Sequence, residues 1–313
     1  MFSPASASEH SQLTIAVVGL GSIGGVAAGC LAGSGRHSVT ACVRRPLEHL
    51  TLDTPGGTTA VSLQSLTDPV QAKPADWVLL CTKAYQTTDA APWLHHLCTP
   101  ATHVAVLQNG IDQVRSVTPL ANGASVMPVV VYYNGERLAP DHVRMRQGAD
   151  TDVAVADDEA CRAFAALFDG TPMRVKCVAD IGTLLWRKLL INGIANPITT
   201  LTQQRQAVLR RPDIVEFAHA ILAEAIAVAR ADGAKLADDE TARAMTTLFT
   251  FSGELGTSMY FDRLAGRKME VEAITGAIVA AGKRHGIATP LNAAMLALLR
   301  AINDATASGS SVS

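Results

Sequence analysis

The chain has 313 residues, of which 48% are hydrophobic and 17% are charged. This composition excludes a disordered or collagen-like protein, and the length predicts about two domains, each large enough to fold without disulfides. The formal net charge is −2, so overall charge does not favour nucleic acid or an anionic membrane as a partner. Six cysteines occur without a Cys-x-x-Cys pair or a Cys/His cluster, which favours free thiols, no metal site and a cytoplasmic location.

The two ends of the chain are expected to lie outside the folded domains. Residues 1–12 are rich in Ser and Ala and contain no Lys or Arg, so they do not resemble a secretory signal. The apolar stretch 13–35 approaches the length of a membrane span, but its many glycines argue against one. We expect disordered tails at residues 1–12 and 306–313.

The first half of the chain alternates short apolar runs with helical patterns. This alternation is typical of βαβ units, and it predicts a Rossmann-type, mainly parallel sheet with helices on both faces in a domain of residues 13–179. The expected strands are residues 13–18, 38–43, 77–81, 103–107, 125–132 and 173–178.

The second half contains long Ala-, Leu- and Ile-rich stretches with helical spacing. This pattern predicts an all-helical domain of residues 180–305 that binds the substrate. Its long apolar helices also favour dimerisation through this domain, so we expect a homodimer. No flexible linker separates the two halves, so we expect closely packed domains with a cleft between them. The expected helices are residues 182–196, 213–232, 239–251, 271–286 and 291–302.

A glycine-rich turn follows the first expected strand and opens a helix. Its sequence is Gly19-Leu20-Gly21-Ser22-Ile23-Gly24. In this context the first glycine permits the tight turn, the second admits a pyrophosphate to the backbone, and the third allows close helix packing. All six residues are therefore predicted to bind a dinucleotide; the alternative is a glycine-rich turn that binds nothing.

The end of the second expected strand predicts which dinucleotide is bound. An NAD site places an Asp or Glu there to accept bonds from the ribose hydroxyls, but residues 36–47 contain no acid, and Arg44 and Arg45 follow Val43. A guanidinium binds a 2′-phosphate, so the pattern favours NADPH/NADP⁺. Two solvated surface arginines are the alternative.

Polar residues follow two further expected strands. Lys83 and Gln86 come after the strand 77–81, and Asn109-Gly110 comes after the strand 103–107. Ligands of open parallel sheets bind beyond the carboxyl ends of the strands, so Lys83, Gln86 and Asn109 are expected on the nicotinamide side of the cofactor site. Ordinary turn chemistry is the alternative.

One expected helix carries a polar stripe. Lys188, Asn192 and Asn196 are spaced four residues apart, which places them on one face of a helix that is otherwise apolar. Asn is a mediocre helix former, so this stripe fits a ligand-binding cleft better than an ordinary solvent face. Pro197 is expected to end or kink the helix, and Arg187 to be structural.

Further polar candidates lie near residue 260. Ser258 and Asp262 are four residues apart and can share a helix face. Glu270 and Glu272 precede an apolar helix, and the residues alone do not separate a catalytic carboxylate from one stabilised by the helix dipole.

Together these blocks resemble the ketopantoate reductase (2-dehydropantoate 2-reductase) family, in family order from about Leu13 to Ile302. The matching residues are Gly19 to Gly24, Arg44, Lys83 to Gln86, Asn109-Gly110, Trp186 to Leu189, Asn192, Asn196-Pro197, Ser258-Met259, Asp262, Glu270 and His285 to Pro290.

The resemblance implies NADPH-dependent reduction of 2-dehydropantoate to (R)-pantoate on the way to pantothenate and coenzyme A. It implies that Lys188 is the general acid and that Glu270 orients the substrate hydroxyl. It further implies that Asn109 and Ser258 hold the substrate carboxylate, that Asn192 and Asn196 position the substrate, and that Lys83 supports the cofactor.

Two features depart from the family pattern. Asp112 stands where a glycine is expected, and the aromatic pair Tyr260-Phe261 lies beside Ser258. Because both flank the expected substrate pocket, a reductase of another small 2-oxo acid is an alternative. A non-catalytic, NADP-binding redox sensor is a second alternative, although a sensor has no need of the polar helix stripe.

Overall fold

Most strands expected in the first half form one parallel sheet in the computed structural model, which describes residues 12–307. The strand order is β5-β2-β1-β6-β7-β8, and every neighbouring pair is parallel. This confirms the predicted mainly parallel sheet. Its strands are β1 (Thr14–Val18), β2 (Ser38–Cys42), β5 (Gln64–Leu66), β6 (Trp77–Leu80), β7 (His103–Val106) and β8 (Ser125–Pro128).

The register aligns the carboxyl ends of the central strands. Val18 at the end of β1 pairs with Cys42 of β2 and with Leu80 of β6. Leu80 in turn pairs with Val106 of β7. The segments that follow β1, β2, β6 and β7 therefore leave the sheet at one edge.

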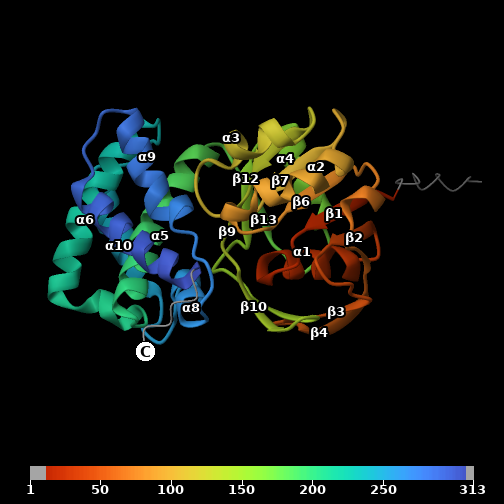
Figure 1. Cartoon of the computed structure of the whole chain (residues 1–313), viewed down its shortest axis with the longest axis horizontal. Coiled ribbons are helices and arrows are strands. Elements are labelled where there is room, and N and C mark those ends of the chain that lie inside the picture. Colours follow the sequence, from red (N-terminus) through yellow and green to blue (C-terminus); the bar gives the residue numbers. More distant parts are fainter. Residues whose placement is uncertain (1–11, 308–313) are drawn as a thin grey trace, which may run out of the picture. The chain divides into compact units, whose positions relative to one another are not determined.

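Both faces of this sheet are covered, as its alternating side chains require. Val17 belongs to an apolar cluster with residues of α1 (Ser22–Gly33) and α4 (Glu159–Leu167). Val18, on the other face, belongs to a cluster with residues of α2 (Ala91–Leu97). Figure 1 labels these helices around the strands of the sheet.

Two smaller sheets were not predicted as separate sheets. The expected strand 173–178 is present as β13 but lies in one of these sheets, and the expected strand 125–132 is divided between β8 and β9. A four-stranded sheet has the order β10-β11-β3-β4, and a three-stranded sheet has the order β13-β12-β9. Gly25 and Gly29 of α1 lie against Val143 and Leu52 of the first of these sheets, which accounts for small residues on this helix. The strands are β3 (His49–Thr54), β4 (Gly57–Ser62), β9 (Val130–Val131), β10 (Asn134–Ala139), β11 (His142–Arg146), β12 (Val153–Ala156) and β13 (Val175–Val178).

The second half is helical, as expected. Its core is one cluster of buried Leu, Ile, Val, Ala and Met side chains, and α5 packs against α6, α7, α8 and α10. The elements are α5 (Ile181–Thr202), α6 (Pro212–Ala231), α7 (Glu240–Thr250), α8 (Ser258–Leu264), the π-helical turn η6 (Glu272–Gly276), α9 (Ala277–Arg284) and α10 (Pro290–Ala307).

The helix α5 does not end at Pro197. It continues to Thr202 and closes with Gln203 in the left-handed conformation. Proline removes one helical hydrogen bond, but Ile194 and Ile198 on either side are buried in the core. Burial of this apolar face keeps the segment helical.

The chain forms two compact units, and each unit consists of segments that are not contiguous in the sequence. The first consists of the residues up to Thr82, Thr87–Leu107 and Val114–Cys177. The second consists of Lys83–Gln86, Gln108–Gln113 and the chain from Val178 onward. Two short segments that follow β6 and β7 thus belong to the helical unit.

The remaining short elements are η1 (Pro69–Gln71), η2 (Ala84–Gln86), η3 (Thr88–Ala90), α3 (Gln113–Val117), η4 (Thr118–Leu120) and η5 (Gln206–Arg210). Across residues 12–307, none of the helices combines the length and apolar character needed to cross a bilayer. The expected tails, residues 1–12 and 306–313, fall almost wholly outside the described residues, and α10 runs to Ala307.

Candidate active site

The glycine turn after β1 has the geometry that its spacing predicts. Gly19 adopts φ +93°, a conformation that L side chains rarely take. A Cβ on Gly24 would lie 2.0 Å from the Gly19 carbonyl oxygen and 2.8 Å from Cβ of Cys81. These two glycines are therefore required by the turn itself and by the packing of α1 on the end of the sheet.

Gly21 has a different environment. It is the N-cap of α1, no side chain caps the helix there, and a Cβ built on it would meet no atom within 4 Å. The space beside Gly21 is open, and the first N–H groups of a 12-residue helix point out of its N-terminus. This environment fits the diphosphate of a dinucleotide, which backbone N–H groups and the helix dipole bind.

Arg44 lies two residues beyond the end of β2 and is exposed. Within residues 12–307 neither its guanidinium nor that of Arg45 forms a hydrogen bond or an ion pair. Arg44 is thus available to an anion that approaches the carboxyl edge of the sheet.

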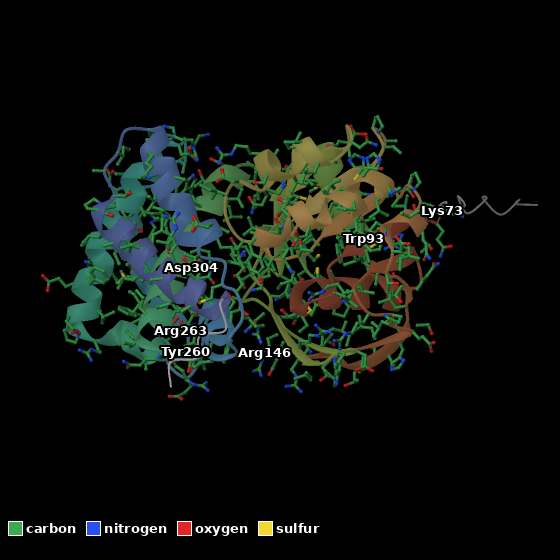
Figure 2. The ribbon with its side chains drawn as sticks, in the orientation of Figure 1. Lys73, Trp93, Arg146, Tyr260, Arg263 and Asp304 are labelled. Atoms are coloured by element: carbon green, nitrogen blue, oxygen red, sulfur yellow. The ribbon has the colours of Figure 1, made fainter. Side chains whose placement is uncertain are left out.

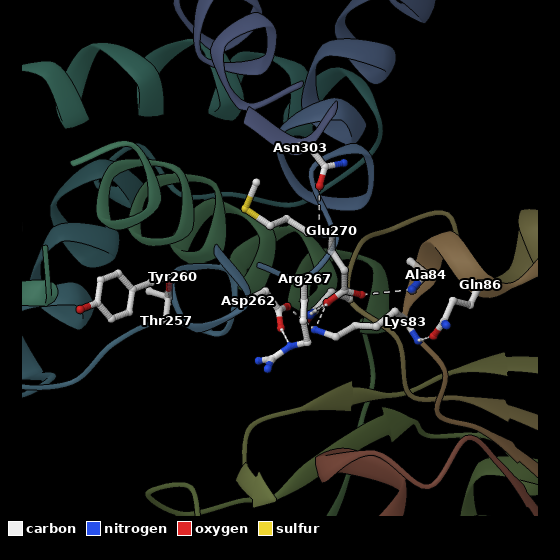
Figure 3. A network of polar contacts seen from close by, with 11 residues as sticks. Lys83, Ala84, Gln86, Thr257, Tyr260, Asp262, Arg267, Glu270 and Asn303 are labelled. Carbon is white, nitrogen blue, oxygen red and sulfur yellow. Dashed lines mark hydrogen bonds and ion pairs between the residues drawn. The ribbon is translucent and has the colours of Figure 1, made fainter. Parts of the chain in front are cut away.

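A buried polar cluster in the helical unit joins residues far apart in the sequence (Figure 3). The Lys83 ammonium lies 2.9 Å from Asp262 Oδ2 and 3.1 Å from Glu270 Oε2. The carboxylates of Asp262 and Glu270 are only 7% and 5% exposed. Burial lowers the pKa of Lys83, but the charges of Glu270 and Asp262 outweigh that effect, and the net shift is upward.

Glu270 accepts three hydrogen bonds. Its Oε1 accepts one from the Ala84 N–H at 3.1 Å, and its Oε2 accepts one from Asn109 Nδ2 at 3.1 Å and one from Lys83. A carboxylate offers about four lone-pair positions, so one position on Oε1 is left for a further donor.

Gly110 explains how Asn109 reaches this carboxylate. Its φ is +103°, and a Cβ there would lie 2.8 Å from the carbonyl oxygen of Ala273 in η6. Gln113 holds the same loop by donating hydrogen bonds to the carbonyls of Gly110 and Gln108. Glycine therefore lets the segment after β7 lie directly against the turn that follows Glu270.

The polar stripe of α5 is present. Lys188 and Asn192 are half-buried, and Asn196 is 4% exposed. Burial lowers the pKa of Lys188 from 10.5 to about 8, and the charge of Glu270 limits this decrease. The three polar side chains form no hydrogen bond with any residue in the described range 12–307, so they can bind a ligand.

The two candidate glutamates have different environments. Glu270 is buried within the polar cluster, whereas Glu272 is 62% exposed and pairs with Arg300 at 2.6 Å. The structure therefore separates two carboxylates that the residue pattern alone left equivalent, and the buried one is Glu270, which the family resemblance had selected.

Other expected site residues lie outside this cluster. Ser258 begins α8 and is exposed, with no hydrogen bond to a described residue. Gln86 hydrogen-bonds to the Lys83 backbone: its Oε1 accepts from the Lys83 N–H at 3.4 Å, and its own backbone N–H donates to the Lys83 carbonyl at 2.8 Å. Arg187 pairs with Glu240 at 2.9 Å, as expected of a structural residue.

The two aromatic residues near Ser258 differ in burial. Tyr260 is 7% exposed and Phe261 is 44% exposed. Arg263 on the same helix, labelled with Tyr260 in Figure 2, donates hydrogen bonds to the carbonyls of Thr200 and Leu201 at the end of α5.

The sequence analysis did not assign roles to Asp262 and Arg267. Asp262 Oδ1 accepts a hydrogen bond from Arg267 Nε at 2.9 Å while its Oδ2 binds Lys83. Asp262 had two signals in the sequence, its position four residues after Ser258 and its place among the residues that match the family, and neither points toward Lys83.

The arrangement suits proton transfer to an anionic organic substrate. With respect to the described residues 12–307, it offers a partly desolvated ammonium, a buried carboxylate with one open acceptor position, and two carboxamides without partners. In the part of the chain that the structure describes, no group of His, Cys, Asp and Glu side chains could hold a metal ion.

Comparison with known families gives matches to both halves of the chain. The family model described as ketopantoate reductase PanE/ApbA matches residues 15–158. The model described as ketopantoate reductase PanE/ApbA C terminal matches residues 180–303.

Individual relatives match over nearly the whole chain. A 2-dehydropantoate 2-reductase of Caulobacter vibrioides is 37% identical over 288 residues, covering 92% of this chain and 98% of the relative. The crystal structure of a PanE/ApbA family ketopantoate reductase from Ralstonia eutropha has a TM-score of 0.85 at 29% identity, covering 94% of this chain and all of the other. A dimeric ketopantoate reductase from Staphylococcus aureus has a TM-score of 0.83 at 26% identity, covering 94% and 100% of the two chains.

Proposed function

The chain belongs to the ketopantoate reductase family, and from this premise we propose that it reduces 2-dehydropantoate (ketopantoate) to (R)-pantoate, a step of pantothenate and coenzyme A biosynthesis. The observation that carries the proposal is the half-buried Lys188, whose ammonium has no partner among residues 12–307 and whose pKa is lowered to about 8. An oxidoreductase that forms a hydroxyl from a carbonyl needs such a proton donor.

The family implies a dinucleotide cofactor, and we propose NADPH. The open space beside Gly21 and the uncapped start of α1 fit a diphosphate. Arg44, without a described partner, fits a 2′-phosphate, and no acidic residue between 36 and 47 would repel it. When bound, the reduced nicotinamide supplies a hydride to C2 of the 2-oxo acid.

Lys188 donates the proton. Its ammonium stabilises the negative charge that develops on the carbonyl oxygen and then transfers a proton to that oxygen, which becomes the C2 hydroxyl. A pKa of about 8 leaves the lysine mostly protonated near neutrality while making the transfer easier than from an ordinary lysine.

The other polar residues bind and orient the substrate. Glu270 accepts the substrate hydroxyl at the open position on Oε1. Asn109 and Ser258 bind the carboxylate, and Asn192 and Asn196 hold the reacting end near Lys188. Lys83 fixes Glu270 and supports the cofactor side, with Gln86 beside it. In this scheme residues 13–179 bind the cofactor and residues 180–305 bind the substrate, with Asn109 of the first range contributing to the substrate site.

The test is the loss of NADPH absorbance with ketopantoate, compared with a short panel of other 2-oxo acids. Ketopantoate should give the highest kcat/KM. A clear preference for another 2-oxo acid would replace the substrate while leaving the reaction type in place. Tight NADPH binding without oxidation by any 2-oxo acid would favour a redox sensor instead.

A variant pair identifies the proton donor. Lys188→Ala should lower kcat by about 10²- to 10⁴-fold while NADPH still quenches protein fluorescence. Lys235→Ala is the matched control, because Lys235 is 86% exposed and its only ion pair, with Asp180, spans 3.8 Å. Normal turnover in Lys188→Ala would exclude Lys188 as the acid.

We also propose a homodimer in the cytoplasm. The helical unit exposes several large apolar side chains, which a second copy would cover, and a relative is described as dimeric. Six free cysteines suit a reducing compartment. Light scattering should give twice the 32.8 kDa of one chain, and a monomeric mass would contradict the dimer. The exposed apolar residues are Phe249, Phe251, Leu255, Phe261, Leu264 and Leu298.

A further inference from the structure

Asp262 uses both carboxylate oxygens to hold two cations of the polar cluster. Its Oδ2 lies 2.9 Å from Lys83 Nζ, and its Oδ1 lies 2.9 Å from Arg267 Nε. Figure 3 shows Asp262 between these two side chains, with Glu270 on the other side of the Lys83 ammonium. Lys83 is therefore shared by two buried carboxylates.

The charges of this cluster balance. Asp262 and Glu270 carry two negative charges, and Lys83 and Arg267 carry two positive ones. Removing one partner of a buried ion pair leaves a charge without compensation, so the remaining groups must rearrange. Without Asp262, the Lys83 ammonium would have Glu270 as its only anionic partner.

We propose that Asp262 is a positioning residue for the reductase reaction: by holding Lys83 and Arg267, it prevents Lys83 from pairing with Glu270 alone, so that the negative charge of Glu270 still acts on Lys188. This inference rests on the proposed function, because it concerns the proton donor of that reaction. Asp262 contacts neither Lys188 nor the open acceptor position of Glu270, and it acts through Lys83.

The charged groups around Lys188 leave Glu270 as its main electrostatic partner. Burial lowers the pKa of Lys188, and among the described residues the charge of Glu270 is what raises it. On the neighbouring elements, Glu240 of α7 is paired with Arg187, and Glu272 of η6 is paired with Arg300. Arg263 of α8 is engaged with main-chain carbonyls of α5.

Two more groups stand beside the cluster. The Lys268 ammonium lies 4.8 Å from the centre of the Tyr85 ring. Burial raises the pKa of Tyr85, so this phenol stays neutral over the range in which Lys188 titrates. Tyr85 therefore adds no charge in that range, and a shift in the titration of Lys188 reports on the charge balance of the cluster.

The experiment measures kcat/KM for ketopantoate as a function of pH in variants that change the charge of the cluster. The readout is the alkaline limb, the part of the profile in which kcat/KM falls as the pH rises. Asp262→Asn leaves the cluster with one excess positive charge, so the limb should move about 0.5–1 pH unit lower. Lys83→Met leaves one excess negative charge and should move the limb higher. The double variant restores the balance, and its limb should return toward that of the wild type. A loss of packing alone would lower the rate at every pH without these opposite shifts.

Two further variants control for charge and folding. Asp262→Glu keeps the charge and should keep the limb in place. Asp239→Asn makes the same chemical change at the N-cap of α7, where the aspartate is 59% exposed and paired with Arg243, and should change nothing. Because Arg267 is 59% exposed, we expect the Arg267→Gln variant to fold. It should move the alkaline decrease of kcat/KM to higher pH, and this result is obtained even if Asp262→Asn does not fold.

A direct titration separates this inference from the proposed function. The Cε resonance of ¹³C-lysine in the cofactor-free protein, assigned with Lys188→Met, gives the pKa of Lys188 without turnover. The resonance should titrate at lower pH in Asp262→Asn and at higher pH in Arg267→Gln. Unchanged titration in both variants overturns the role of Asp262. Failure of the wild type to reduce any 2-oxo acid overturns the function alone.

Discussion

Lys188 and Glu270 are coupled electrostatically. Burial lowers the pKa of the Lys188 ammonium to about 8, and the negative charge of Glu270 prevents a further decrease. Because Glu270 is itself held by Lys83, Asn109 and the Ala84 N–H, its charge stays fixed near Lys188, the proposed proton donor.

The first prediction concerns the pH dependence of catalysis. The general acid must be protonated, so kcat/KM should fall as pH rises above about 8, the pKa of Lys188 in the free enzyme. Initial rates measured with saturating NADPH at pH values on both sides of the pKa give this decrease in kcat/KM directly. A plateau extending to about pH 10 would mean that another group donates the proton.

The second prediction concerns stability. The folded chain binds the Lys188 proton less tightly than the unfolded chain, so the protonated lysine opposes folding below about pH 8, and this effect disappears as the pH approaches 10.5. Lys188→Met should therefore raise the free energy of unfolding by about 1–3 kcal/mol near pH 7 and by much less near pH 10. Urea unfolding at the two pH values measures the difference. Lys235→Met, at an exposed site, should show no such dependence on pH.

The third prediction contrasts two glycines of the same turn. Gly24→Ala places a Cβ 2.0 Å from a carbonyl oxygen, so it should destabilise the chain by several kcal/mol. Gly21→Ala meets no protein atom within 4 Å and should leave the melting temperature nearly unchanged. It should nevertheless weaken dinucleotide binding at least about tenfold, because the added methyl group occupies the space of the diphosphate. Undiminished NADPH affinity in Gly21→Ala would place the cofactor elsewhere.

The fourth prediction concerns the choice of cofactor. Arg44→Ala should raise KM for NADPH about tenfold or more and leave KM for NADH unchanged, because only NADPH carries the 2′-phosphate. Arg162→Ala is the control in the same unit, since Arg162 is 60% exposed and pairs only with Asp157. Equal changes in KM for NADPH and for NADH would show that Arg44 does not bind the 2′-phosphate.

The parallel sheet could be predicted from the sequence because its strands are buried on both faces and appear as continuous apolar runs. The strands β4 and β10 could not, because most of their residues are exposed or half-buried and their sequences mix polar and apolar side chains. Pro197 misled the prediction of the end of α5, because its effect on the local hydrogen bonds was smaller than the effect of core burial.

The site was predictable where its residues share one element. Helical spacing alone brought Lys188, Asn192 and Asn196 together. The contact between Lys83 and Asp262 joins residues 179 positions apart, and no local pattern indicates such a pair. The residue pattern alone did not separate Glu270 from Glu272, because both precede the same apolar helix. The family resemblance selected Glu270, and tertiary packing distinguishes the environments of the two carboxylates.

The segments Lys83–Gln86 and Gln108–Gln113 make the helical unit a discontinuous stretch of the polypeptide. A fragment beginning at Val178 would lack Lys83 and Asn109, and the carboxylates of Asp262 and Glu270 would lose donors that offset their desolvation. The two halves cannot be excised or exchanged between relatives by a single cut in the gene. A working chimera needs both short segments transplanted together with the C-terminal half.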